Sequence, residues 1–266
     1  MNIFEYQFFW NAVISVLLMS VTAGIIGTYV VSRRMLFITG GITHASFGGL
    51  GLGLFAGLPP TLTALVFAIL SAAGVEWTSR RGAVREDSAI AVFWSLGMAL
   101  GIIFVFLTPG YTPGLTGFLF GNILTVTVRD LQLFALFTAV TVFLAAIYNK
   151  TVIYTAFDRD FAKVRGINVR AVEYTVMLIL SVCVVLSIKL IGIMLLLSFL
   201  SLPQMAAELF VRRYNGIMLL SALIAVAGGL GGLAVSFAID KPAGACIVFV
   251  LAILYMALRC FKKRAQ

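Results

Sequence analysis

Long apolar runs, repeated along the whole chain of 266 residues, constrain the fold of this protein more than any other feature. A helix needs about 20 consecutive apolar residues to cross a bilayer, and runs of this length recur from the first residues to the last. Charged residues make up only 11% of the chain, whereas soluble domains contain roughly 25%. The chain must therefore use lipid as its solvent.

The continuity of the apolar runs predicts helices rather than a β-barrel. Backbone polar groups in lipid must be satisfied within the structure, which only helices and closed barrels achieve. Barrel strands alternate apolar and polar residues over about ten positions, but the runs here are continuous and longer. The sequence predicts an all-α, polytopic membrane protein with eight or nine transmembrane helices in one domain over residues 1–266. The expected spans are 8–32, 35–57, 59–77, 88–107, 131–149, 172–189, 191–211, 215–238 and 243–261.

The distribution of basic residues predicts the orientation of the chain. If the N-terminus is outside, most basic residues gather in the inner loops and the C-terminal tail, as the positive-inside rule requires. Of the 19 lysines and arginines, only Arg129, Lys189 and Lys241 fall on the outer side. This distribution accounts for the net charge of +9 without a nucleic-acid partner. We therefore expect an inner-membrane protein whose N-terminus is outside and whose C-terminus is in the cytoplasm.

The longest inner loop, residues 150–172, is predicted to hold a short cytoplasmic helix near 155–168. Asp158 and Asp160 at its start suit the positive end of a helix dipole, and Gly166 is placed to end the helix. Three apolar side chains recur at helical spacing and predict one apolar face: Phe157, Phe161 and Val164. Such a helix either packs on its own protein or docks a soluble partner.

Sequence motifs for ATP binding and catalysis are missing from the chain. No GxxxxGK[ST] segment occurs, so the usual ATP-binding loop is absent. The chain has a single histidine, and no nucleophile has a second histidine or a nearby carboxylate in the sequence to act as its base. The cysteines Cys183, Cys246 and Cys260 are scattered and form no disulfide framework. We expect a protein that is not an enzyme and holds no stable cofactor.

The second expected span contains that single histidine, His44, beside a stripe of small residues. The stripe repeats every four residues and would let another helix approach closely; its members are Gly41, Ala45, Gly49, Gly53 and Gly57. Ionisable side chains within a membrane are costly and usually face the bundle interior or a transport pathway. His44 is therefore either a hydrogen-bonding residue between helices or a ligand for a divalent transition metal.

Several short segments, in their order and spacing, resemble the membrane permeases of bacterial zinc, manganese and iron ABC importers, the family often called ABC-3. The resemblance covers nearly the whole chain. The segments that carry it are 29–34, 43–45, 86–90, 120–124, 156–166, 202–203 and 240–245.

The resemblance implies a transport subunit for a divalent transition metal ion in a bacterial inner membrane. It implies a homodimer of permeases, separate ABC ATPase subunits that hydrolyse ATP, and an extracytoplasmic metal-binding protein. The loop helix matches the family's coupling helix, which assigns ATPase contacts to Phe157, Asp158, Asp160, Phe161, Val164 and Gly166. The alternative is a stand-alone secondary transporter driven by an ion gradient, since Gly-rich broken helices also occur in such carriers.

One position departs from the family's pattern at the expected metal pathway. The family often has an Asp four residues before the His, and this chain has Gly40 there. His44 would then act with Thr43, Thr39 and Ser46, completed by backbone carbonyls or water. Because Mn²⁺ prefers oxygen ligands such as carboxylates, the missing Asp favours zinc over manganese or iron.

Overall fold

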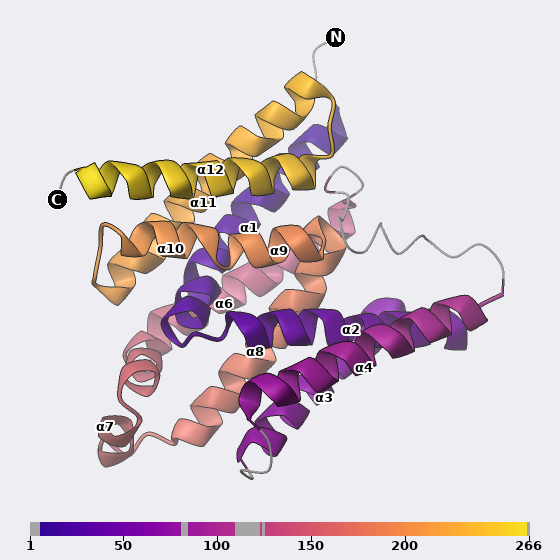
Figure 1. Ribbon diagram of the computed structural model, residues 1–266, viewed down its shortest axis with the longest axis horizontal. Coiled ribbons are helices and arrows are strands. Elements are labelled where there is room, and N and C mark those ends of the chain that lie inside the picture. Colours follow the sequence, from indigo (N-terminus) through magenta and orange to yellow (C-terminus); the bar gives the residue numbers. More distant parts are fainter. Residues whose placement is uncertain (1–5, 81–84, 110–122, 124–125, 265–266) are drawn as a thin grey trace.

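The computed structural model describes residues 6–80, 85–109, 123 and 126–264, and these residues form helices and no strands (Figure 1). The all-α prediction is thus confirmed. The helices are α1 Gln7–Ser32, α2 Leu36–Ala56, α3 Pro60–Arg80, α4 Glu86–Leu107, α6 Val128–Phe157, α7 Arg159–Val164, α8 Val169–Ile191, α9 Ile193–Phe199, α10 Leu202–Glu208, α11 Tyr214–Ile239 and α12 Ala243–Arg264. Of the segment 120–124, only Ile123 lies within the described residues.

Seven of the described helices are long and apolar enough to cross a membrane: α1, α3, α4, α6, α8, α11 and α12. Helix α2 has 21 residues, which is also long enough to span, but its threonines, glycines and histidine make it more polar. The expected span 191–211 is instead divided into the short helices α9 and α10. The prediction of eight or nine spans is therefore approximate.

The breaks on either side of α9 have local causes. Gly192, with a positive φ of 79°, separates α8 from α9. Pro203 lies in the first turn of α10, where its missing N–H would have no partner within the helix in any case. The side chain of Gln204, fully buried, donates from Nε2 to the Ala23 carbonyl of α1 at 2.7 Å. The break is thus held against the middle of α1.

The connections between helices gather at two ends of the bundle. At one end, Lys262 donates to the Leu209 carbonyl, and Arg33 donates to the Ala156 carbonyl at 3.1 Å. At the other end lie two further pairs, Asn11 with the Val126 carbonyl and Lys189 with Asp130. Lys262 and Arg33 are basic residues predicted on the inner side, and Lys189 is one predicted on the outer side, so the two ends of the bundle agree with the split of basic residues in the sequence.

Helix α2 is packed between α3 and α4 with almost no space between backbones, and Figure 1 shows α2 and α4 side by side. A Cβ at Gly49 would lie 2.7 Å from the Ala64 Cα of α3, and one at Gly41 would lie 2.5 Å from Cγ2 of Ile90 in α4. The small-residue stripe therefore serves packing within one chain. It is not left free to bring two copies of α2 together.

Candidate functional site

His44 lies in the third turn of α2, and its imidazole stacks on the indole of Trp94 in α4. The ring centroids are 4.2 Å apart and the ring planes differ by 10°. The ring is only partly buried, yet its Nδ1 atom is buried and has no hydrogen-bond partner among the described residues. A neutral imidazole in this setting has a nitrogen that no neighbouring helix uses. Among the described residues, Nδ1 of His44 therefore makes no interhelical hydrogen bond.

Gly40 lies one helical turn before His44, under the same indole. A Cβ at residue 40 would lie 3.3 Å from Cζ3 of Trp94 and 3.7 Å from Cη2. The indole thus occupies part of the space that a longer side chain at this position would need. Trp94 also lies 6.0 Å from the ring of Phe37, centroid to centroid. The same indole therefore covers His44 and limits the side chain that fits at residue 40.

The three hydroxyl residues expected near the metal are fully buried and bonded to their own helix. Thr39 donates to the Met35 carbonyl, Thr43 to the Thr39 carbonyl and Ser46 to the Thr43 carbonyl, at 3.0, 2.6 and 2.7 Å. Thr43 and Ser46 are one and two positions from His44, and such neighbours do not face each other on a helix. The structure does not gather these hydroxyls around the imidazole.

No group of three or more His, Cys, Asp or Glu side chains able to hold a metal ion occurs among the described residues. One chain therefore offers a single imidazole at this position.

The second candidate surface is the short helix α7, which Figure 1 shows at the periphery of the molecule between α6 and α8. The Asp158 side chain caps it by accepting from the backbone N–H groups of Asp160 and Phe161, at 3.1 and 2.9 Å. The buried Ala162 holds it against the rest of the chain. Gly166 follows with a positive φ of 76° and leads the chain away.

The apolar side chains expected on this helix are largely exposed. Val164 is 87% exposed, Phe161 is 40% exposed and Phe157 is 66% exposed. The structure places Phe157 as the last residue of α6, before the extended Asp158, so it joins the surface from a second helix. Lys163 donates to Asp160 at 2.9 Å, and this hydrogen bond lowers the pKa of the Asp160 carboxyl. The surface is thus apolar with charged residues beside it, which suits a docking site.

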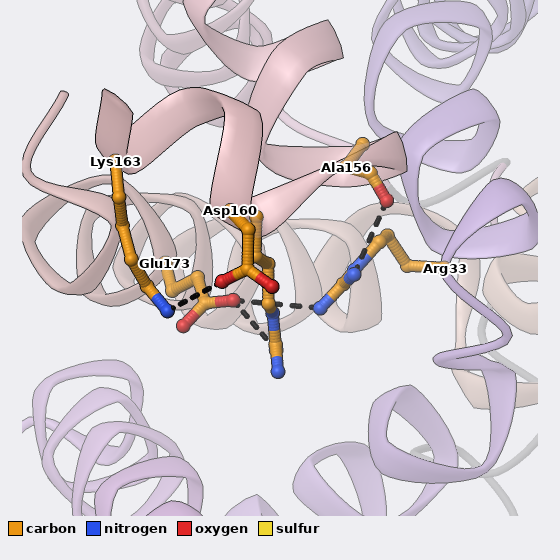
Figure 2. A network of polar contacts seen from close by, with 6 residues as sticks. Arg33, Ala156, Asp160, Lys163 and Glu173 are labelled. Atoms are coloured by element: carbon orange, nitrogen blue, oxygen red, sulfur yellow. Dashed lines mark hydrogen bonds and ion pairs between the residues drawn. The ribbon is translucent and has the colours of Figure 1, made fainter. Parts of the chain in front are cut away.

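Behind α7 lies a group of charged residues that sequence reasoning missed, which we call the Glu173 cluster: Arg33, Arg159, Glu173 and the Ala156 carbonyl. Figure 2 shows Arg33, at the end of α1, and Glu173 of α8 pointing toward one another, and Arg159 of α7 forms an ion pair with the same carboxylate. The start of α7 meets the second turn of α8 here, so residues far apart in sequence become neighbours. Nothing in the local spacing of residues signals such a meeting, since its members come from separate helices.

Comparison with known proteins adds independent findings. The model of the ABC 3 transport family matches residues 5–262. An uncharacterized membrane protein, slr2045 of Synechocystis, is 35% identical over 265 residues, which cover 97% of this chain and 92% of the relative. The manganese transport system membrane protein MntC of Listeria innocua is 27% identical over 254 residues, covering 96% and 90%. Among solved structures, PsaBC from Streptococcus pneumoniae in complex with Fab aligns with a TM-score of 0.86 and 28% identity, covering 96% and 91%.

Proposed function

The chain belongs to the ABC 3 transport family, and from this premise we propose that it is the membrane permease subunit of an ATP-driven importer for a divalent transition metal ion. The observation that carries the proposal is the pairing of an exposed apolar helix, α7, with a membrane chain that has no ATP-binding loop. In this proposal the energy comes from a partner that hydrolyses ATP, and α7 offers the surface for it. The permease itself is not catalytic.

The proposed importer has three kinds of protein component. ABC ATPase subunits dock on α7 and the neighbouring Phe157, an extracytoplasmic metal-binding protein delivers the ion, and two copies of the permease form the pathway. Because one chain supplies one imidazole at His44, a homodimer would supply two. The basic end of the bundle faces the cytoplasm in this proposal, which follows the positive-inside rule.

Two metals compete as substrate, each supported by a separate observation. The relative from Listeria innocua is named as a manganese transport protein, which supports manganese. The donor chemistry supports zinc, because imidazole suits zinc whereas carboxylate and water oxygens suit manganese, and Gly40 supplies no carboxylate. The substrate is a divalent transition metal ion, with zinc and manganese as the two to separate by measurement.

A secondary transporter is the alternative, and the break between α9 and α10 is the observation that favours it, since such carriers often use broken helices. Coupling to protons would require carboxylates within the membrane. The carboxylates of the described helices lie within about two turns of a helix end instead, at Glu76, Glu86, Asp87, Asp130, Asp160, Glu173 and Glu208. This placement favours the ATP-driven importer.

Uptake of radioactive manganese and zinc by cells that lack this chain, with and without a restored copy, tests the proposal. We expect uptake only in the restored cells, and we expect it to persist when an ionophore collapses ion gradients while ATP is maintained. Uptake that stops with the gradients and continues without ATP would establish the secondary transporter instead.

A further inference from the structure

We propose that Glu173 is a positioning residue that holds α7 in a fixed relation to the turn leading into α2, so that movement of the docking surface reaches the helix of His44. The inference rests on the proposed function, because it assigns a role in linking ATP hydrolysis to transport. It concerns a residue outside both the α7 surface and the His44 site.

The carboxylate of Glu173 is shared by two arginines from different helices. Its Oε1 atom lies 2.6 Å from Nη2 of Arg159, the first residue of α7, and 3.4 Å from Nη2 of Arg33, at the end of α1 (Figure 2). The Glu173 side chain is only 11% exposed and Arg33 is 21% exposed. Poor access of solvent to Glu173 and Arg33 strengthens their attraction relative to a surface ion pair, whereas Arg159 is 54% exposed. One carboxylate therefore joins α1, α7 and the start of α8.

Arg33 brings the connection to α2. It caps the C-terminus of α1, and α2 begins only three residues later at Leu36. Arg34 between them has a positive φ of 57°, which a non-glycine residue adopts at a cost, so the turn is tightly defined. His44 lies eight residues into α2, roughly 12 Å along the helix axis at 1.5 Å per residue. A displacement of Arg33 would thus be passed to a short, stiff segment.

A cavity makes the Glu173 cluster important for this connection. A space of about 420 Å³ lies among α1, α6, α8 and α11, and its lining is mostly apolar. Tyr29, Val152 and Val172 line it, and the cluster residues Arg33, Ala156 and Glu173 lie within about one turn beyond them on the same helices. Part of the space between α1 and the pair α6 and α8 is therefore unfilled near the cluster. The guanidinium of Arg33, which also donates to the Ala156 carbonyl at 3.1 Å, bridges the gap.

Removing the charge of Glu173 should weaken its contacts with Arg33 and Arg159 without changing the packing around residue 173. Glu173→Gln keeps the shape of the side chain but leaves Arg33 and Arg159 near each other with like charges, so the two should separate. The docking surface on α7 would remain exposed and intact. The expected defect is hydrolysis that no longer drives transport.

The test compares Glu173→Gln with Asp130→Asn in proteoliposomes that hold the permease with its co-purified ATPase subunit. Asp130 is a matched control, because its side chain is also 11% exposed and its partner Lys189 lies 2.5 Å away, at the opposite end of the bundle. The readout is manganese or zinc ions transported per ATP hydrolysed. A change in the amount of folded protein alone would not alter this ratio.

We expect the ratio to fall about tenfold for Glu173→Gln, within the usual range of coupling between sites, and to stay unchanged for Asp130→Asn. Glu173→Asp should restore part of it. Arg159→Gln, at a side chain that is 54% exposed and so of little weight in folding, should reproduce the loss. A wild-type ratio in either Glu173→Gln or Arg159→Gln overturns the inference. Absence of transport by the wild-type chain would overturn the proposed function, and this inference with it.

Discussion

Helix α2 and helix α7 are the two candidate functional elements of this protein, and their surroundings are opposite. Most of α2 is buried, with backbone atoms of α3 and α4 against its glycines. Helix α7 has six residues, and only Ala162 among them is buried. Substitutions in α2 therefore perturb packing and transport together, whereas substitutions on α7 can alter partner binding alone. The difference lets the fold and the function be tested separately.

The largest effect is expected from adding a methyl group within the packing of α2. In Gly49→Ala, the new Cβ would meet the backbone of Thr63 and lie 2.7 Å from the Ala64 Cα. Because a backbone cannot yield as a flexible side chain does, we expect a loss of about 2–3 kcal/mol in unfolding free energy. The measurement is the temperature at which the detergent-solubilised protein aggregates.

Gly231→Ala in α11 is the matched control for this substitution. The nearest atom to its added Cβ would be Cγ1 of Val250 at 3.7 Å, an ordinary van der Waals contact. We expect no loss of stability there, because the added methyl group has room and alanine favours helices. Equal stability of Gly49→Ala and Gly231→Ala would show that α2 is not confined as described.

The next largest effect is expected at His44, where a substitution within α2 should abolish uptake but leave packing largely intact. In His44→Ala the stack on Trp94 is lost, which costs only about 1 kcal/mol, so the protein should still assemble in the membrane. Uptake should fall to background, because no other histidine can replace the imidazole. The measurement is uptake of radioactive zinc and manganese per unit of membrane-inserted protein. Uptake at the wild-type rate would leave His44 as a packing residue.

On α7 we expect a smaller effect that spares stability. Val164 is 87% exposed, so Val164→Asp should leave the thermal stability of the permease unchanged. If α7 docks the ATPase, a charge in the apolar surface should weaken binding at least tenfold, since anchors of this kind are worth about 1–2 kcal/mol or more. Phe161→Asp should act in the same direction, although it also disturbs the contact with Tyr154. Unchanged affinity in both variants would make α7 a surface helix of its own chain only.

The sequence was sufficient to predict the helical spans, because a bilayer demands long apolar segments and such segments are local. The division into α9 and α10 was missed, since the apolar run continues through Leu200 while the backbone breaks there. Exposure of the α7 surface agrees with its predicted amphipathic pattern. Phe157 joins this surface from α6, because the extended Asp158 interrupts the helix.

The parts that sequence reasoning could not reach depend on contacts between distant helices. Trp94 lies 50 positions after His44, at no spacing that relates the two. Glu173 likewise meets Arg33 and Arg159 only once α1, α7 and α8 are assembled. The hydroxyls of Thr39, Thr43 and Ser46 are adjacent to His44 in sequence but bonded to backbone carbonyls of α2. Proximity in sequence and proximity in space thus differ most at the candidate site.

The smallest expected effect, and the one that sharpens the comparison most, is a change of metal preference from Gly40→Asp. A carboxylate one turn from His44 would supply the oxygen ligand that manganese prefers. The indole of Trp94 stands in its way, because the new Cβ would lie 3.3 Å from Cζ3. We therefore expect Gly40→Asp alone to shift the ratio of manganese to zinc uptake only slightly, by about twofold, as the indole must move for the carboxylate to reach the ion.

Trp94→Leu, combined with Gly40→Asp, removes this obstacle and turns the prediction into a double-mutant cycle. Neighbouring residues that share a space should give effects that do not add. The double variant should shift the uptake ratio toward manganese by more than the product of the two single shifts, measured by competition between the two ions at equal membrane levels of protein. Independent, multiplicative shifts would mean that the indole does not limit residue 40. Metal preference would then be set elsewhere along the pathway, and the stack on His44 would serve packing alone.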